Sequence, residues 1–168
     1  HIENYASIAE ALRGYTQRSV ISVMDMYKKF HKRLAQLNQE GVGIVEHGGQ
    51  TSPRYDAMME SIAQSAHEND MEIFSCSEER DMTSYGILPG KCIDDEFIEQ
   101  TFGIEVGHKK DPGQRAACGC VISKDIGIYD SCLFGCQYCY ATSNFERSKV
   151  NYKNHDHLSP SLIGWHEP

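Results

Sequence analysis

Three closely spaced cysteines near the C-terminal end constrain this chain more than any other feature. They occur in the segment Cys132-Leu-Phe-Gly-Cys136-Gln-Tyr-Cys139, which has the spacing C-x3-C-x2-C. Three thiolates can bind three irons of a four-iron, four-sulfur (4Fe-4S) cluster, which normally takes four cysteine ligands. One iron then stays open, as one coordination position does at a catalytic zinc. The spacing therefore predicts a cluster with an iron available for chemistry.

The remaining four of the seven cysteines are enough for a closed tetrathiolate site. A disulfide within Cys118-Gly-Cys120 would close a very tight ring, and a reducing compartment keeps such thiols free, so we favour metal ligation. For Cys118 and Cys120 three alternatives stay open: they ligate a second cluster, complete the first one, or do neither. Structural zinc is the alternative metal for the C-x3-C-x2-C set. The four upstream cysteines are Cys76, Cys92, Cys118 and Cys120.

Charge and hydropathy exclude two classes of partner. The net charge of −8 argues against general nucleic-acid binding, which needs a positive surface. No apolar run approaches the roughly 20 residues that span a bilayer, so we expect no membrane partner. The N-terminus has no apolar signal core, and we expect a cytoplasmic protein.

Hydrophobic periodicity predicts alternating helices and strands over the first two thirds of the chain. The first predicted strand is nearly continuous in apolar residues, as a parallel strand is. We expect strands at 19–24 and 71–75, and helices at 4–12, 28–39, 55–67 and from Asp94 or Asp95 to Phe102, where Gly103 ends the last helix.

This order predicts an α/β fold whose parallel βα units resemble part of a TIM-like barrel. After Gly103 no long amphipathic period remains, which indicates an irregular, cysteine-rich region that a bound metal stabilises. We expect βα units over 1–103, a cluster-binding region over 104–145 and a C-terminal tail over 146–168.

Polar side chains follow each predicted strand. Because parallel strands end at the same edge of a sheet, we expect these groups to line one site together with Cys76. Glu78, two residues beyond Cys76, is the candidate catalytic residue. The other members of this set are Ser22, Asp25 and Tyr27 after the first strand and Glu79 and Arg80 after the second.

Several motifs occur in an order that resembles a known family. They are Glu79-Arg-Asp, Pro89-Gly-Lys-Cys92-Ile-Asp94, Cys118-Gly-Cys120-Val, Ser123-Lys-Asp125-Ile-Gly127 and Tyr129-Asp-Ser-Cys132-x3-Cys136-x-Tyr-Cys139-Tyr-Ala141. Together they resemble the prokaryotic family called domain of unknown function 1848, from about Ser19 to Ser143. The resemblance implies that the chain is the C-terminal part of such a protein.

The family's cysteine cluster is similar to that of radical S-adenosylmethionine enzymes. The resemblance implies that Cys132, Cys136 and Cys139 ligate the cluster and that S-adenosylmethionine binds its open iron. An electron from a donor would then cleave the sulfonium and release a deoxyadenosyl radical. Tyr138 matches the aromatic position that lies against adenine, and Gly135, with no Cβ, lets the backbone approach the cluster.

Two features depart from that superfamily. The motif lies late in the chain rather than after a first barrel strand, and no Gly-Gly-Glu-type segment follows Cys139. The leading hypothesis is a radical S-adenosylmethionine-like enzyme of unknown substrate. The alternative is a non-catalytic zinc or iron–sulfur module that binds a partner. A second chain, or a missing N-terminal part, would complete the open sheet.

Overall fold

The computed structural model describes residues 1–24, 31–44 and 52–165. The chain forms two compact units. The first comprises His1–Met24 and His47–Ser123, and the second comprises Asp25–Glu46 and Lys124–Pro168. The C-x3-C-x2-C motif lies in the second unit, whereas all four upstream cysteines lie in the first.

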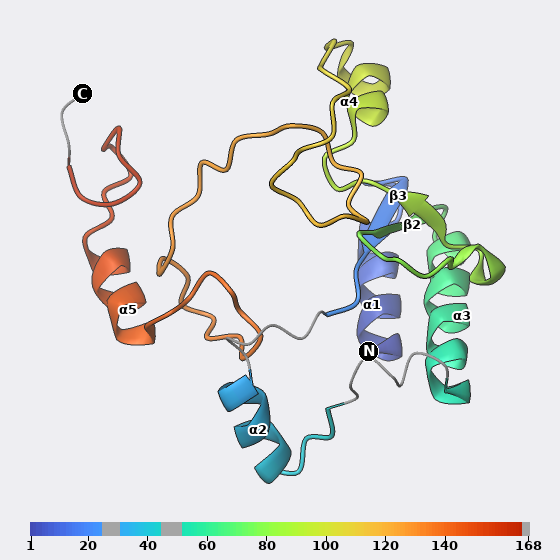
Figure 1. Cartoon of the computed structure of the whole chain (residues 1–168), viewed down its shortest axis with the longest axis horizontal. Coiled ribbons are helices and arrows are strands. Elements are labelled where there is room, and N and C mark those ends of the chain that lie inside the picture. The colour runs from blue at the N-terminus through green and yellow to red at the C-terminus, as the bar shows by residue number, and fades with distance from the viewer. Residues whose placement is uncertain (25–30, 45–51, 166–168) are drawn as a thin grey trace. The chain divides into compact units, whose positions relative to one another are not determined.

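A parallel three-stranded sheet organises the first unit (Figure 1). Its strands are β1 (Arg18–Ile21), β2 (Glu72–Cys76) and β3 (Leu88–Gly90), in the order β1-β2-β3. Val20 pairs with Phe74 on one side of the central strand, and Phe74 pairs with Leu88 on the other. Because all three strands are parallel, their carboxyl ends lie at the same end of the sheet.

Two helices pack together beside this sheet (Figure 1). They are α1 (Ile2–Leu12) and α3 (Pro53–Glu68). The Ser52 hydroxyl caps α3 by accepting the Tyr55 N–H at 3.2 Å, and Pro53 occupies the first turn, where a missing N–H costs nothing. The core between helices and sheet contains Ala9, Met59, Ile62, Ala63, Ala66, Met71, Ile73, Met82 and Ile87.

Helix α4 (Asp95–Phe102) follows the sheet and has the predicted ends. Asp94 caps it by accepting the Phe97 N–H at 3.3 Å. Gly103 ends it with φ of 65°, a left-handed conformation that glycine adopts without a steric penalty. A short 3-10 helix, η2 (Thr83–Tyr85), precedes β3.

The second unit contains α2 (His31–Gln39) and α5 (Phe145–Lys153). Lys28 to Phe30, the predicted start of α2, lie outside the described residues. Helix α5 lies after Gly103, where no amphipathic period predicted a helix. Its sequence is strongly polar and lacks an apolar stripe, but Asn144 caps it by accepting the Arg147 N–H at 3.1 Å.

The parallel α/β arrangement of the first unit is confirmed, and a barrel is not shown. β1 ends at Ile21, earlier than the predicted strand to Met24. Periodicity missed β3 because a three-residue strand containing Pro and Gly has little strand propensity.

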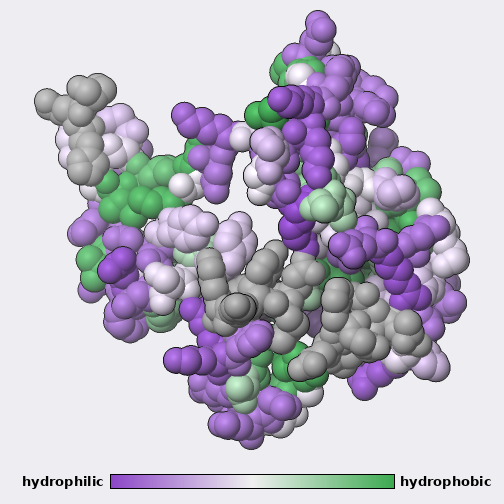
Figure 2. All heavy atoms as spheres, viewed as in Figure 1, coloured by the Kyte–Doolittle hydropathy of each residue, from purple (hydrophilic) through white to green (hydrophobic). Residues whose placement is uncertain are grey.

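Hydrophilic residues dominate the face drawn in Figure 2, where hydrophobic residues form small separate patches. In the part of the chain that the structure describes, no helix has both the length and the apolar character needed to cross a membrane.

Candidate metal centres

The carboxyl end of the central strand carries a group of buried cysteines. Cys76 is the last residue of β2, and its side chain lies beside those of Cys118 and Cys120. Each of the three is 5% exposed. Their sulfur atoms all lie within 4.8 Å of one another. The structure thus forms a possible metal site from the cysteines whose spacing was the weaker signal in the sequence.

The loop after α4 places Cys118 and Cys120. The Asp111 N–H donates to the Cys120 carbonyl at 3.0 Å and holds this part of the loop in a hairpin-like turn. Gly119 separates the two cysteines, and a Cβ there would lie 3.2 Å from Cγ of Lys91. The loop therefore lies close to Lys91, the residue directly after β3.

Cys92, two residues after β3, faces the same group from an exposed position. Its side chain raises the pKa of Cys76, whereas its backbone N–H lowers the pKa of both Cys76 and Cys120. The Ile93 N–H donates to the Cys120 sulfur at 3.4 Å. The turn after β3 therefore directs two backbone donors at the sulfurs.

The buried thiols differ in their preference for the thiolate form. Burial, with a smaller contribution from the Cys92 side chain, raises the pKa of Cys76 to about 12. Burial also raises the pKa of Cys118. Burial acts in the same direction on Cys120, but the Ile93 amide and neighbouring thiols outweigh it and lower that pKa. A bound cation would favour the thiolate at all three positions.

The C-x3-C-x2-C cysteines lie on a loop of the second unit. Cys132 and Cys136 are exposed and Cys139 is half-buried. Among the described residues, these three do not form a set with all sulfurs within 4.8 Å. Gly135 has φ of 65°, which requires a residue without a Cβ clash, so it shapes the turn between the cysteines.

The spread of these three sulfurs is compatible with a 4Fe-4S cluster. In a 4Fe-4S cluster each thiolate binds its own iron, so the sulfurs need not converge on one point. The loop also offers thiolate character at Cys139. The Thr142 hydroxyl, 3.5 Å from the Cys139 sulfur, lowers the pKa of that thiol, and the Arg33 guanidinium contributes.

Arg33 of α2 contacts this loop directly. Its Nη1 donates to the Cys139 carbonyl at 3.2 Å, and its Nη2 donates to the Thr142 carbonyl at 2.7 Å. A single planar guanidinium therefore fixes two carbonyls at the end of the motif.

Asp130 holds the two ends of the loop together. Its buried carboxylate accepts the Ser143 N–H at 2.6 Å, the Ser143 hydroxyl at 2.8 Å and the Asn144 N–H at 3.0 Å. Its own N–H donates to the Ala141 carbonyl at 2.9 Å. These amide and hydroxyl donors lower the pKa of Asp130. All three cysteines of the motif lie between the segments that this residue joins.

Tyr138 is exposed beside the half-buried Cys139. The rings of Tyr129 and Tyr140 meet edge-to-face, with centroids 6.4 Å apart. Tyr138 is 60% exposed, and its adenine-binding role stays a prediction.

Glu78 lies at the same sheet edge as Cys76. Its Oε1 accepts the Val23 N–H at 2.7 Å and the Ser22 hydroxyl at 3.4 Å, so the polar groups after β1 and β2 do meet. Asp25 and Tyr27 lie outside the described residues. Glu78 also borders a cavity of about 380 Å³ lined by Ser75, Glu78, Glu79, Arg80, Asp81, Met82, Thr83 and Pro89.

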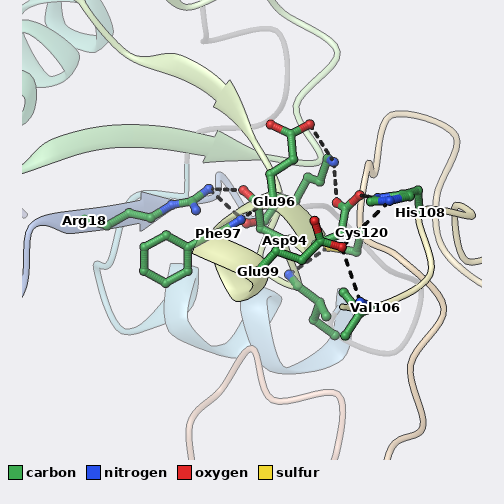
Figure 3. A network of polar contacts seen from close by, with 11 residues as sticks. Arg18, Asp94, Glu96, Phe97, Glu99, Val106, His108 and Cys120 are labelled. Atoms are coloured by element: carbon green, nitrogen blue, oxygen red, sulfur yellow. Dashed lines mark hydrogen bonds and ion pairs between the residues drawn. The ribbon is translucent and has the colours of Figure 1, made fainter. Parts of the chain in front are cut away.

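A polar network beside the cysteine group was missed by the sequence reasoning (Figure 3). Asp95 is only 3% exposed, and its carboxylate lies 2.6 Å from Lys91 Nζ and 2.6 Å from His108 Nδ1. Next to it, Arg18 pairs with Asp94 at 2.6 Å. Lys91 and Asp95 are only four residues apart, whereas only the tertiary fold brings Arg18 to Asp94.

Comparison with known proteins identifies a family and no individual relative. The profile described as "Domain of unknown function (DUF1848)" matches residues 1–141. A search of curated proteins and a search of solved structures each found no significant match. The profile match begins before Ser19, where the resemblance was expected to start, and the position of the chain within a longer protein stays a prediction. The chain belongs to the DUF1848 family.

Proposed function

We propose that this chain is an iron–sulfur protein in which Cys132, Cys136 and Cys139 hold a 4Fe-4S cluster. We further propose that it acts as a radical S-adenosylmethionine-like enzyme on an unknown substrate. The observation that carries the proposal is the exposed C-x3-C-x2-C loop. Its ends are joined by Asp130, and the Thr142 hydroxyl lowers the pKa of its last cysteine, Cys139.

Several residues would hold and orient the bound groups. When bound, a three-thiolate cluster supplies an electron and one open iron. Gly135 gives the loop its left-handed turn, and Arg33 holds the carbonyls of Cys139 and Thr142 in place. Tyr138 offers an exposed aromatic face for an adenine ring. The electron would come from a separate donor protein or reductant.

Glu78 is proposed as a catalytic carboxylate of the first unit. Glu78 lies two residues beyond the carboxyl end of the central strand β2. Parallel α/β folds place their sites at this end of the sheet. Its Oε1 is held by the Val23 N–H, and its side chain borders the cavity at that edge. A carboxylate fixed in this way can accept a proton from a bound substrate.

The larger architecture forms part of the proposal. We propose that the three strands belong to a TIM-like barrel that a second chain, or further N-terminal residues, would complete. Both β1 and β3 are edge strands among the described residues, and an open edge invites pairing. The free state of all seven cysteines supports a reducing, cytoplasmic location.

A non-catalytic metal module is the second candidate function. The observation that favours it is the convergence of the Cys76, Cys118 and Cys120 sulfurs, which needs no open coordination position. In this case the metal stabilises the fold, and the protein acts by binding a partner.

Metal analysis of anaerobically purified protein tests the proposal. We expect iron and acid-labile sulfide in the wild type and their loss in Cys136→Ser, with Ser131→Ala as the control that retains them. The electron paramagnetic resonance signal of the reduced cluster should shift when S-adenosylmethionine is added, and deoxyadenosine should form under reduction. Zinc without iron would overturn the iron–sulfur assignment. Iron without a spectral shift or deoxyadenosine would overturn the enzyme assignment alone.

A further inference from the structure

We propose that Cys92 completes a closed tetrathiolate zinc site with Cys76, Cys118 and Cys120. This site is separate from the C-x3-C-x2-C loop and does not depend on the function proposed for that loop. It holds one zinc ion and has a structural role.

The spacing of the sulfurs indicates a single ion. Zinc–sulfur bonds of about 2.3 Å in a tetrahedron place neighbouring sulfurs about 3.8 Å apart. The three buried sulfurs, all within 4.8 Å of one another, need to move little to reach this geometry. A four-iron cluster would spread its thiolates over separate irons, so the close set fits zinc better.

Cys92 is the candidate fourth ligand because the residue after it already reaches the group: the Ile93 N–H donates to the Cys120 sulfur at 3.4 Å. Cys92 itself lies close enough to shift the pKa of both Cys76 and Cys120. Cys92 also belongs to the short connection between β3 and α4. Strand β3 fixes the backbone of this connection at one end, and the Asp94 cap fixes it at the other. A fourth thiolate from this exposed position would close the tetrahedron from the side that faces solvent.

Backbone amides offset the charge of such a site. Zinc with four thiolates carries a net negative charge, which needs hydrogen-bond donors close to the sulfurs. Cys120 receives the Ile93 N–H at 3.4 Å, and the Cys92 N–H lowers the pKa of the same thiol. The thiols release their protons to solvent as the ion binds, so binding tightens as the pH rises.

The placement of the ligands gives the site its role. Cys76 lies at the end of β2, Cys92 after β3, and Cys118 and Cys120 on the loop after α4. The loop of residues 104–123 has no helix or strand in the structure and shows only one isolated β-bridge, between Lys110 and Val121. One ion bound to all four cysteines would fasten this loop to the edge of the sheet.

Zinc content, cobalt spectra and thermal unfolding of the full chain test the assignment. We expect the reduced wild type to bind one zinc ion, and Cys92→Ser to bind zinc at least about tenfold more weakly, since even losing a residue behind the ligands costs about 10–100-fold. The cobalt form should show the intense bands of tetrahedral thiolate coordination and lose intensity in Cys92→Ser. Cys92 is the most informative position because its exposed side chain contributes little packing.

A triple variant replacing Cys132, Cys136 and Cys139 by Ser is the matched control and should keep both the zinc and the cobalt spectrum. A chelator should lower the melting temperature of the wild type and of this triple variant, with a smaller shift in Cys92→Ser.

Unchanged zinc affinity and an unchanged cobalt spectrum in Cys92→Ser would overturn the assignment of Cys92 as the fourth ligand. Zinc loss in the triple variant would overturn the separate site, as would a disulfide among the four cysteines in freshly reduced protein. Iron retained at the C-x3-C-x2-C loop in Cys92→Ser would leave the proposed function intact.

Discussion

At the scale of single residues, the C-x3-C-x2-C loop depends on contacts that its cysteine spacing does not predict. Arg33 reaches the loop from a helix more than one hundred residues earlier, and Asp130, inside the quoted motif, joins the two ends of the loop. A lone Arg gives no sequence signal, because such residues occur on every protein surface. The cysteines could be predicted from their number and spacing, but the residues that support them could not.

Replacing Arg33 should change the electronic properties of the proposed cluster. Arg33→Gln removes a positive charge that lies beside Cys139, and the cluster's reduction potential should become more negative because net charge and hydrogen bonding set it. Redox titration of the loaded protein measures the shift. Lys32→Gln, an exposed change on the same helix, is the control and should leave the potential unchanged. An equal shift in both variants would contradict a specific role for Arg33.

His108 should make the stability of the first unit depend on pH. Its hydrogen bond to the buried Asp95 carboxylate raises its pKa, so folding favours the protonated imidazole. The stabilisation is fully present below the unfolded pKa of about 6.5 and is lost as the pH rises through the raised folded value.

His108→Gln should therefore lower the free energy of unfolding relative to the wild type, and this loss should be largest near pH 5 and shrink as the pH rises. Urea unfolding of both proteins between pH 5 and 9 measures it. Because the His108 side chain is 66% exposed, solvent screening keeps the effect small. A constant stability difference at every pH would contradict the ion pair.

At the scale of secondary-structure elements, periodicity predicted the elements that bury an apolar stripe. Helices α1, α3 and α4 and strands β1 and β2 all match predicted segments, because each contributes side chains to a core or has a clear cap. Strand β3 and helix α5 were missed for the opposite reason. Backbone pairing with β2 defines β3, and the Asn144 cap together with polar contacts defines α5.

Shortening a core side chain of the central strand β2 should destabilise the first unit strongly. Ile73 of β2 is 1% exposed and belongs to the core with α1 and α3. Ile73→Ala removes buried methyl groups and leaves a cavity, which should cost about 2–5 kcal/mol of the free energy of unfolding. Chemical denaturation measures this cost.

The matched control is Ile126→Ala, where the side chain is 79% exposed. A surface change of this kind should stay within about 0.5 kcal/mol of the wild type. Equal losses at the two positions would show that Ile73 is not in a packed core.

At the scale of the whole molecule, the cysteines separate into two sets that lie in different compact units. The sequence divides seven cysteines into three and four, and the structure places four in the first unit and three in the second. Two metals can therefore stabilise two parts of one chain without sharing a ligand.

Removing each metal should loosen one unit only. A zinc chelator should speed hydrogen exchange over the loop of residues 104–123, whose cysteines lie beside Cys76. Cys136→Ser should speed exchange between Asp130 and Asn144, the segment closed by the Asp130 carboxylate. Hydrogen-exchange mass spectrometry on the full chain resolves the two segments. Simultaneous loosening of both segments by either change would show that the two sites are coupled.

The sequence by itself determined which cysteines are candidate metal ligands and the parallel α/β class of the first unit. Cysteine spacing reports covalent distance along the chain, and apolar period reports which side of an element is buried, so both can be read from neighbouring residues. Only the tertiary structure decided that Cys76, Cys118 and Cys120 converge, with Cys92 beside them. Their convergence follows from the parallel pairing of β1, β2 and β3 and from the return of a distant loop to the sheet edge. Such long-range closure depends on packing between segments, which leaves no period in the sequence.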